Sequence, residues 1–231
     1  MPDINMSEIS RLRQEIYVLF SNLLYEPDSE VHKELKQGYH LEIWQNYQKI
    51  CRQWEGCLQS EKTDEAFSLE VPDSWQDENL PSLNEWKKIW QRNLDFDNPK
   101  IKLIESVYKP WTVDESCQMP FAEEKGYIMG DWAHHMLYLY ELLDFEPPED
   151  FSYCPDHLIL ELEFMSLLVE EAKASQQHQF INQHLDWLDD LIAKAAENEV
   201  AALYLDLLGW IRDYIASDRT YLAGKVDEDN I

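Results

Sequence analysis

Hydrophobic residues recur every three or four positions along most of the chain, the spacing that places them on one face of an α-helix. The first such segment covers residues 7–25 and stops before Pro27, because proline cannot continue a helix. Its phase places Arg11 and Arg13 on the solvent side. The same pattern predicts further helices at residues 29–38, 41–58, 82–94, 127–143, 157–175, 180–196 and 200–215.

Several predicted helix ends carry residues suited to capping. Asp28 or Ser29 can cap the second helix, and Gly38 ends it. The segment Ser82-Leu-Asn-Glu85 is a capping box at the start of the fourth. Gly130 lies inside the helix predicted at 127–143, where it costs up to about 1 kcal/mol relative to Ala. A close approach of another helix would explain that glycine.

Four segments depart from the helical pattern. Residues 60–81 are acidic, contain two prolines and are expected to form a surface excursion. Residues 101–108 alternate apolar and polar side chains like a strand, but no second strand can pair with them, so we expect an extended connector packed on helices. A long loop with large side chains follows at 109–121, and the polar tail at 217–231 is expected to fray. The predicted fold is all-α: a single-domain, bundle-like array of helices over residues 1–231 with no significant sheet.

Composition supports a helical core and limits the class of partner. Hydrophobic residues make up 45% of the chain, and 6 glycines are few for a β-sandwich or barrel. The net charge of −27 repels nucleic acids and anionic membranes, so no nucleic-acid partner is expected. The N-terminus lacks the basic and apolar regions of a secretory signal, no run approaches the roughly 20 apolar residues of a membrane span, and the cysteines lack metal-binding spacing. We therefore expect a cytoplasmic protein with reduced thiols and no stable membrane insertion.

No stretch carries a recognisable catalytic motif. Glu-x-x-His, Gly-x-Ser-x-Gly and glycine-rich phosphate loops are absent from the sequence. His134 and His135 are adjacent, so on a helix they point about 100° apart and cannot easily share one metal ion. We therefore expect no catalytic residue, no metal and no cofactor. A helical metal-dependent hydrolase using His134, His135, Asp156, His157 and Glu161 is the less favoured alternative.

The stretch from Pro155 to Glu161 places two acids and an imidazole at one predicted helix start. Asp156 occupies the N-cap position, His157 would be the first helical residue, exposed at the helix mouth, and Glu161 lies on the same face. Capping alone can explain Asp156, and a first-turn histidine is commonly solvated. A groove with acids and apolar walls would, however, suit a peptide that carries arginines and a hydrophobic run.

Three motifs follow one another along the chain: Glu105-Ser-Val-Tyr108; Gly130-Asp-Trp-Ala133, whose helix ends in Tyr140-Glu-Leu-Leu143; and Pro155-Asp-His-Leu-x-x-Glu-Leu162. In these motifs the chain resembles the TorD/DmsD/NarJ-type redox enzyme maturation chaperones. The opening Tyr17-x-x-x-Ser-x-Leu-Leu-Tyr-x-Pro27 also fits, so the resemblance covers residues 10–215 and leaves out 60–81 and the tail. One departure is Tyr153-Cys154 before Pro155, where family members often carry an acid that Glu146, Glu149 or Asp150 could supply here.

The resemblance implies an all-helical, cytoplasmic, non-catalytic chaperone. Such a chaperone binds the N-terminal, often twin-arginine, signal of the catalytic subunit of a molybdopterin-dependent oxidoreductase and holds it back from export until the cofactor is inserted. By position, the resemblance assigns signal binding to Glu105, Ser106, Tyr108, Trp111, Asp156, His157 and Glu161. Monomer and homodimer both remain open. A generic acidic helical adaptor without signal-peptide specificity is a second interpretation.

Overall fold

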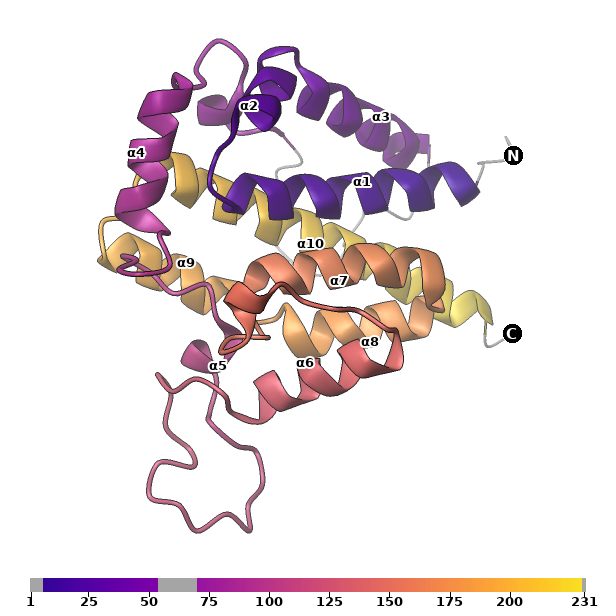
Figure 1. The fold of residues 1–231 in the computed structure, drawn as a ribbon. Coiled ribbons are helices and arrows are strands. Elements are labelled where there is room, and N and C mark those ends of the chain that lie inside the picture. Colours follow the sequence, from indigo (N-terminus) through magenta and orange to yellow (C-terminus); the bar gives the residue numbers. More distant parts are fainter. Residues whose placement is uncertain (1–5, 54–69, 230–231) are drawn as a thin grey trace.

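The computed structural model describes residues 6–53 and 70–229, and their regular structure is helical (Figure 1). The α-helices are α1 (Met6–Leu24), α2 (Ser29–Lys36), α3 (Tyr39–Gln53), α4 (Leu83–Asn93), α5 (Glu105–Tyr108), α6 (Asp131–Leu142), α7 (Leu158–Glu171), α8 (Ala174–His184), α9 (Leu188–Glu197) and α10 (Ala202–Asp229). Two 3-10 turns, η1 (Asp73–Trp75) and η2 (Glu149–Phe151), lie in the connections. Within the described residues the only β-pairing is an isolated bridge between Ile104 and His157. The predicted all-α class is therefore confirmed.

The core is built around the first and last helices. Helix α1 packs against α3 and α7, while α10 packs against α8 and α9 and runs behind α1 and α7 in Figure 1. Buried aromatic rings join the two: Phe20 of α1 meets Trp210 of α10 edge-to-face at 5.1 Å between ring centroids. Trp44 of α3 meets the same Trp210 ring at 5.0 Å. Because these rings come from distant parts of the chain, the core links the N-terminal and C-terminal helices directly.

Arg13 is buried, contrary to its predicted place at the surface. Its Nε lies 2.5 Å from Asp218 Oδ1, its Nη2 donates to Gln177 Oε1 at 2.7 Å, and Tyr17 donates to Asp218 Oδ2 at 2.8 Å. Asp218 belongs to α10, which continues through the segment expected to fray. Both predictions were wrong for one reason. Arg13 and Asp218 are 205 positions apart in the sequence, so their contact leaves no trace in the local pattern.

The second half of the predicted surface excursion is anchored to the core by Trp75 and Leu80, while its other residues are exposed or partly exposed. Residues 60–69 lie outside the described residues, but Trp75 is fully buried, and its indole N–H donates to the Leu203 carbonyl at 2.8 Å. His40 Nε2 contacts the Trp75 carbonyl at 2.7 Å. A single large aromatic side chain therefore anchors a segment whose average composition is polar. The helix predicted at 41–58 is observed as α3, and its last expected residues, 54–58, are not described.

Helix α6 begins at Asp131, four residues later than predicted, and Gly130 is its N-cap rather than an interior residue. The backbone N–H of Asp131 donates to the Trp111 carbonyl at 2.9 Å. A Cβ atom at position 130 would collide with that same carbonyl. The glycine is therefore explained by close approach of the 109–121 loop and not of a second helix.

The helix predicted at 180–196 is two helices, because α8 ends at His184 and α9 begins at Leu188. In the turn between them, the buried Trp187 donates its indole N–H to the His184 carbonyl at 2.8 Å. Asp186 in the same turn forms an ion pair with Lys109. One contact within the turn and one with Lys109 therefore stabilise a helix break that hydrophobic spacing alone did not predict.

The connector at 101–108 is extended only in its first half. Leu158 N–H donates to the Leu103 carbonyl at 2.8 Å, and Glu105 N–H donates to the Asp156 carbonyl at 2.9 Å. The chain then forms the single helical turn α5, which was expected to be extended. These two bonds place the Glu105 motif directly against the Asp156 motif. None of the described helices has the length and apolar character needed to cross a membrane.

Candidate functional site

The turn α5 and the start of α7 form one hydrogen-bonded unit. Asp156 Oδ2 accepts the backbone N–H of Ser106 at 2.7 Å and also the Ser106 hydroxyl. Asp156 was predicted to cap its own helix. It instead accepts an otherwise free amide N–H of the neighbouring helix α5. The N-cap of α7 is His157, whose Nδ1 accepts the Ile159 N–H at 3.3 Å.

His157 is an enclosed side chain, in contrast to the exposed position that the sequence predicted. It is 6% exposed and lies between Phe96 and Phe151, at ring-centroid distances of 5.4 and 5.1 Å. Burial lowers the pKa of His157 to about 3. At neutral pH its imidazole is therefore uncharged and acts as a hydrogen-bond acceptor at the helix start.

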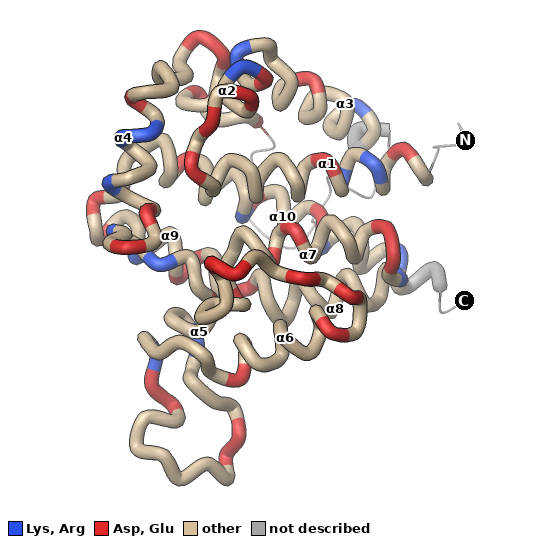
Figure 2. The backbone as a smooth tube through the Cα atoms, in the orientation of Figure 1, with Lys and Arg blue, Asp and Glu red and all other residues tan. Residues whose placement is uncertain are grey.

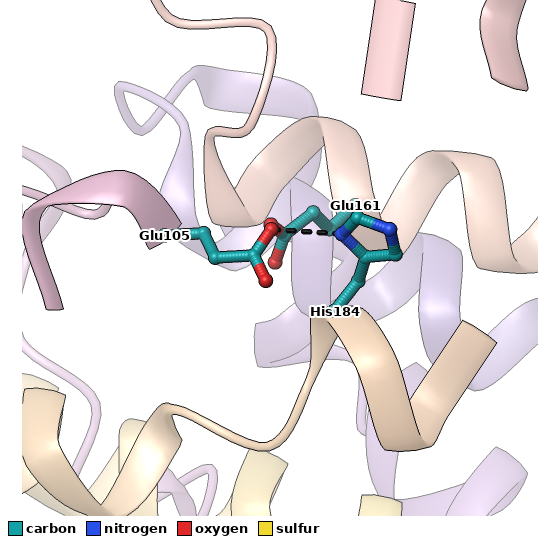
Figure 3. Close-up of side chains that lie close together, drawn as sticks. All are labelled: Glu105, Glu161 and His184. Atoms are coloured by element: carbon teal, nitrogen blue, oxygen red, sulfur yellow. Dashed lines mark hydrogen bonds and ion pairs between the residues drawn. The ribbon is translucent and has the colours of Figure 1, made fainter. Parts of the chain in front are cut away.

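Beside this unit lies a buried cluster of Glu105 from α5, Glu161 from α7 and His184 from α8 (Figure 3). His184 Nδ1 lies 2.8 Å from Glu105 Oε2, and Lys109 Nζ lies 2.7 Å from Glu105 Oε1. Trp187 donates its indole N–H to Glu161 Oε2 at 3.2 Å. Side chains from three separate helices and the α8–α9 turn thus converge on two carboxyl groups.

The electrostatics of the cluster follow from burial and from the proximity of like charges. Burial, then the nearby Glu105 and Asp156, raise the pKa of Glu161 well above its ordinary value. Burial also raises the pKa of Asp156, although its hydrogen bonds with Ser106 work in the opposite direction. Burial lowers the pKa of Lys109, but Glu105 and Asp186 outweigh it and the net shift is upward. Lys109 is therefore the firmly charged cation of this cluster.

The structure brings the predicted site residues together but places them inside the molecule. Glu105, Ser106, Asp156 and Glu161 are 0% exposed, and Tyr108 is buried against Trp187 with its ring stacked at 5.1 Å. Only Trp111 is half-exposed. Hydrogen bonds between Asp156 and Ser106 and between Glu105 and His184 join α5 to the start of α7 and to α8, and none of the buried carboxyl groups faces solvent. Sequence spacing identified the neighbours, but it carried no information on their depth.

A surface groove lies next to this cluster, between α6, α7 and α8. It has a volume of about 280 Å³, and its walls include His135, Leu139, Leu142, Phe164, Glu171 and Phe180. His135 Nδ1 contacts His184 Nε2 at 2.7 Å, so one groove wall touches the buried cluster. Sequence reasoning expected a groove with acids and apolar walls near Asp156, but it did not place one between α6, α7 and α8. Leu139 and Leu142 are further apolar residues of the helix predicted at 127–143, and they were the available signal.

Acidic residues lie along the connector between α6 and α7, as Figure 2 shows. Asp144, Glu146, Glu149 and Asp150 are all exposed, and no ion pair involves them among the described residues.

A second hollow, of about 580 Å³, is rich in lysine. It is lined by Lys100, Lys102, Lys125 and Lys194, with Asp190 and Glu197. This lysine-rich hollow therefore suits a cationic ligand less well than the groove, whose lining contains Glu171 and no lysine or arginine.

The residues of the hydrolase alternative do not converge on one point. His134 Nδ1 contacts the Gly130 carbonyl at 2.9 Å, and His135 contacts His184. Asp156 and His157 are engaged with Ser106 and Ile159 as described above. Across residues 6–53 and 70–229, the group of acidic and imidazole side chains close enough to share an ion is Glu105, Glu161 and His184.

Comparison with known proteins identifies the family. A family model described as nitrate reductase delta subunit matches residues 61–193, including residues 61–81, which the motif comparison had left out. No curated protein and no solved structure matches the chain. The matched segment is more than half of the chain and contains the Glu105, Gly130 and Asp156 motifs together. The chain belongs to the nitrate reductase delta subunit family, the NarJ/TorD-type family of redox enzyme maturation chaperones.

Proposed function

We propose that this chaperone binds the N-terminal leader of the catalytic subunit of a molybdenum-containing oxidoreductase, in the cytoplasm and before export. The leader is of the twin-arginine type, with paired arginines followed by an apolar run. Family membership supports the kind of partner, and the groove between α6, α7 and α8 is the observation that carries the mode of binding. The chaperone performs no turnover and holds the leader while the cofactor is inserted.

The apolar run of the leader is assigned to the groove. Half of its lining residues are leucine or phenylalanine, and one of them, Leu142, is 59% exposed. The volume of about 280 Å³ is near the lower end of ligand pockets, roughly 300 Å³. Such a groove takes a few side chains from one face of a helical peptide, with anchors spaced three and four residues apart.

The arginines of the leader are assigned to the acidic connector and to Glu171 at the groove. Arginine pairs well with carboxylates because its planar group can donate two parallel hydrogen bonds. Each charge-assisted bond is worth about 1.5–3 kcal/mol. Asp156 and Glu161 are given a supporting role, since both are fully buried. The basic hollow lined by Lys100 and Lys102 is disfavoured for a cationic leader.

The test uses a synthetic peptide with Arg-Arg before an apolar run, labelled for fluorescence anisotropy. Leu142→Glu should weaken binding at least about tenfold, since it places a charge against the apolar peptide. Glu146→Gln combined with Glu149→Gln should weaken binding most at low salt, because exposed charges are screened. Val113→Glu is the matched control, because Val113 is 63% exposed and lies on the separate 109–121 loop.

A second peptide carries Asp-Asp in place of Arg-Arg. Equal affinity for both peptides would favour the generic adaptor and remove the leader specificity proposed here. Undiminished binding to the Leu142→Glu variant would remove the groove. Replacing Asp156 and His157 by Ala is a weaker test, because both side chains are buried and lost affinity could follow from lost structure. Circular dichroism of that variant must therefore accompany its binding curve.

A further inference from the structure

We propose that Glu105, Glu161 and His184 form a buried site for one divalent transition-metal ion that clamps α5, α7 and α8 together. One oxygen or nitrogen of each residue lies within 4.8 Å of the others (Figure 3). All three side chains are 0% exposed. The proposal concerns the stability of the helical body and is independent of leader binding.

Each of the three side chains has one polar atom held from outside and one left toward the centre. Glu105 uses Oε1 for Lys109, which leaves Oε2 on the His184 side. His184 uses Nε2 for His135, and its Nδ1 lies 2.8 Å from Glu105 Oε2, a contact that a bound ion would replace. Glu161 uses Oε2 for Trp187, and its Oε1 is buried without a hydrogen-bond partner. Outer contacts of this kind orient the ligands in protein metal sites, where a metal-bound histidine is fixed through its other ring nitrogen.

The local charge also favours a bound cation. Glu105, Asp156 and Glu161 are three acids inside the molecule, and Lys109 is the one lysine paired with them among the described residues. Asp156 Oδ1, like Glu161 Oε1, is buried without a partner. Isolated buried carboxylates are costly, so such a group requires protons or a cation. One divalent ion can replace two protons here.

The donor set indicates the class of metal. Two carboxylate oxygens and one imidazole nitrogen suit borderline ions such as Zn²⁺, Co²⁺ or Fe²⁺ better than Ca²⁺, which prefers oxygen ligands alone. Bonds from Zn²⁺ to such donors measure about 2.0–2.2 Å. To bind one ion, the Glu161 donor would move toward the other two, while Glu105 Oε2 and His184 Nδ1, now 2.8 Å apart, would separate slightly. His135 connects this site to the groove wall, so binding would also fix the position of α6.

The test uses the full chain, stripped with EDTA and refolded from urea with Co²⁺, so that burial of the site does not prevent loading. We expect one Co²⁺ per chain by elemental analysis, visible d–d absorption bands, and displacement of the Co²⁺ by Zn²⁺. Glu161→Gln should lower affinity at least about 100-fold, since loss of a ligand exceeds the 10–100-fold effect of an outer contact. The amide closely matches a protonated carboxyl group in shape, so this variant should keep its helicity.

Two further variants locate the bound ion within the chain. Glu170→Gln on the exposed side of the same helix should leave Co²⁺ binding unchanged. His135→Phe should lower affinity about 10–100-fold while the chain still binds one ion, because His135 only orients His184. Correctly refolded chain with no Co²⁺ would overturn the proposal. So would Co²⁺ binding that Glu161→Gln does not weaken, since the ligands would then lie elsewhere.

Discussion

At the scale of single residues, burial gives His157 a chemistry that its position at a helix start does not reveal. It is enclosed by Phe96 and Phe151, and burial lowers its pKa to about 3, against an unperturbed value of about 6.5. Between these two values the unfolded chain binds a proton that the folded chain excludes. The contribution of His157 to stability is therefore present above pH 6.5 and is lost as the pH falls toward 3.

We predict that His157→Asn makes stability less sensitive to acid. Asparagine can still accept the Ile159 N–H as an N-cap, but it does not titrate. Below pH 6.5 the wild-type free energy of unfolding should fall by about 1.4 kcal/mol per pH unit more than that of the variant. Urea unfolding from pH 7 to pH 4 measures the difference. His178→Asn, on α8, is the control, and parallel curves for wild type and His157→Asn would contradict the assigned burial effect.

Sequence reasoning at this scale found neighbours better than it found depth. The motifs of Glu105, Asp156 and Glu161 were expected to lie side by side, and they do. The motifs are short, and the bonds between them go largely to backbone groups. The same reasoning predicted an exposed His157 and a surface Arg13, both of which are buried. A local pattern reports which face a residue occupies, but the depth of that face depends on which other helices cover it.

At the scale of helices, boundaries set by local chemistry were predicted and boundaries set by distant contacts were not. Asp28 caps α2, and the Ser82–Glu85 capping box opens α4, as expected from their side chains. The α8–α9 break was missed because apolar residues keep helical spacing across it. The distant contacts at that break are Asp186 against Lys109 and Trp187 against Glu161.

Two glycine substitutions test how α6 is joined to its preceding loop. Gly130→Ala should destabilise the protein by about 1–3 kcal/mol, the usual cost of overpacking, because its Cβ would meet the Trp111 carbonyl. Gly209→Ala in α10 is the matched control: no atom lies within 4 Å of its added Cβ, so a gain of up to about 1 kcal/mol is expected from helix propensity. Urea unfolding compares them. Equal effects of the two substitutions would mean that the Trp111 contact does not constrain the loop.

At the scale of the whole molecule, the contact between α1 and α10 joins the N-terminal helix to the C-terminal helix. The C-terminal segment was predicted to fray because its composition is polar, yet Tyr221 and Leu222 are buried and Asp218 is 0% exposed. The family match covers residues 61–193 and so includes neither Arg13 nor Asp218. Their contact follows only from the arrangement of helices in space, where α10 lies alongside the N-terminal helix (Figure 1).

Breaking the Arg13–Asp218 pair should therefore destabilise the whole protein. Arg13→Met leaves Asp218 buried beside Tyr17 without its cation, and removing one partner of a buried pair costs about 3–5 kcal/mol. Arg11→Met, two residues earlier on the same helix, removes only an exposed pair with Glu15 and should cost less than about 0.5 kcal/mol. Arg13→Met combined with Asp218→Leu should recover at least half of the loss, because no unpaired charge then remains inside. Urea unfolding followed by circular dichroism measures all three, and similar losses for the Arg11 and Arg13 variants would show that α10 does not depend on this contact.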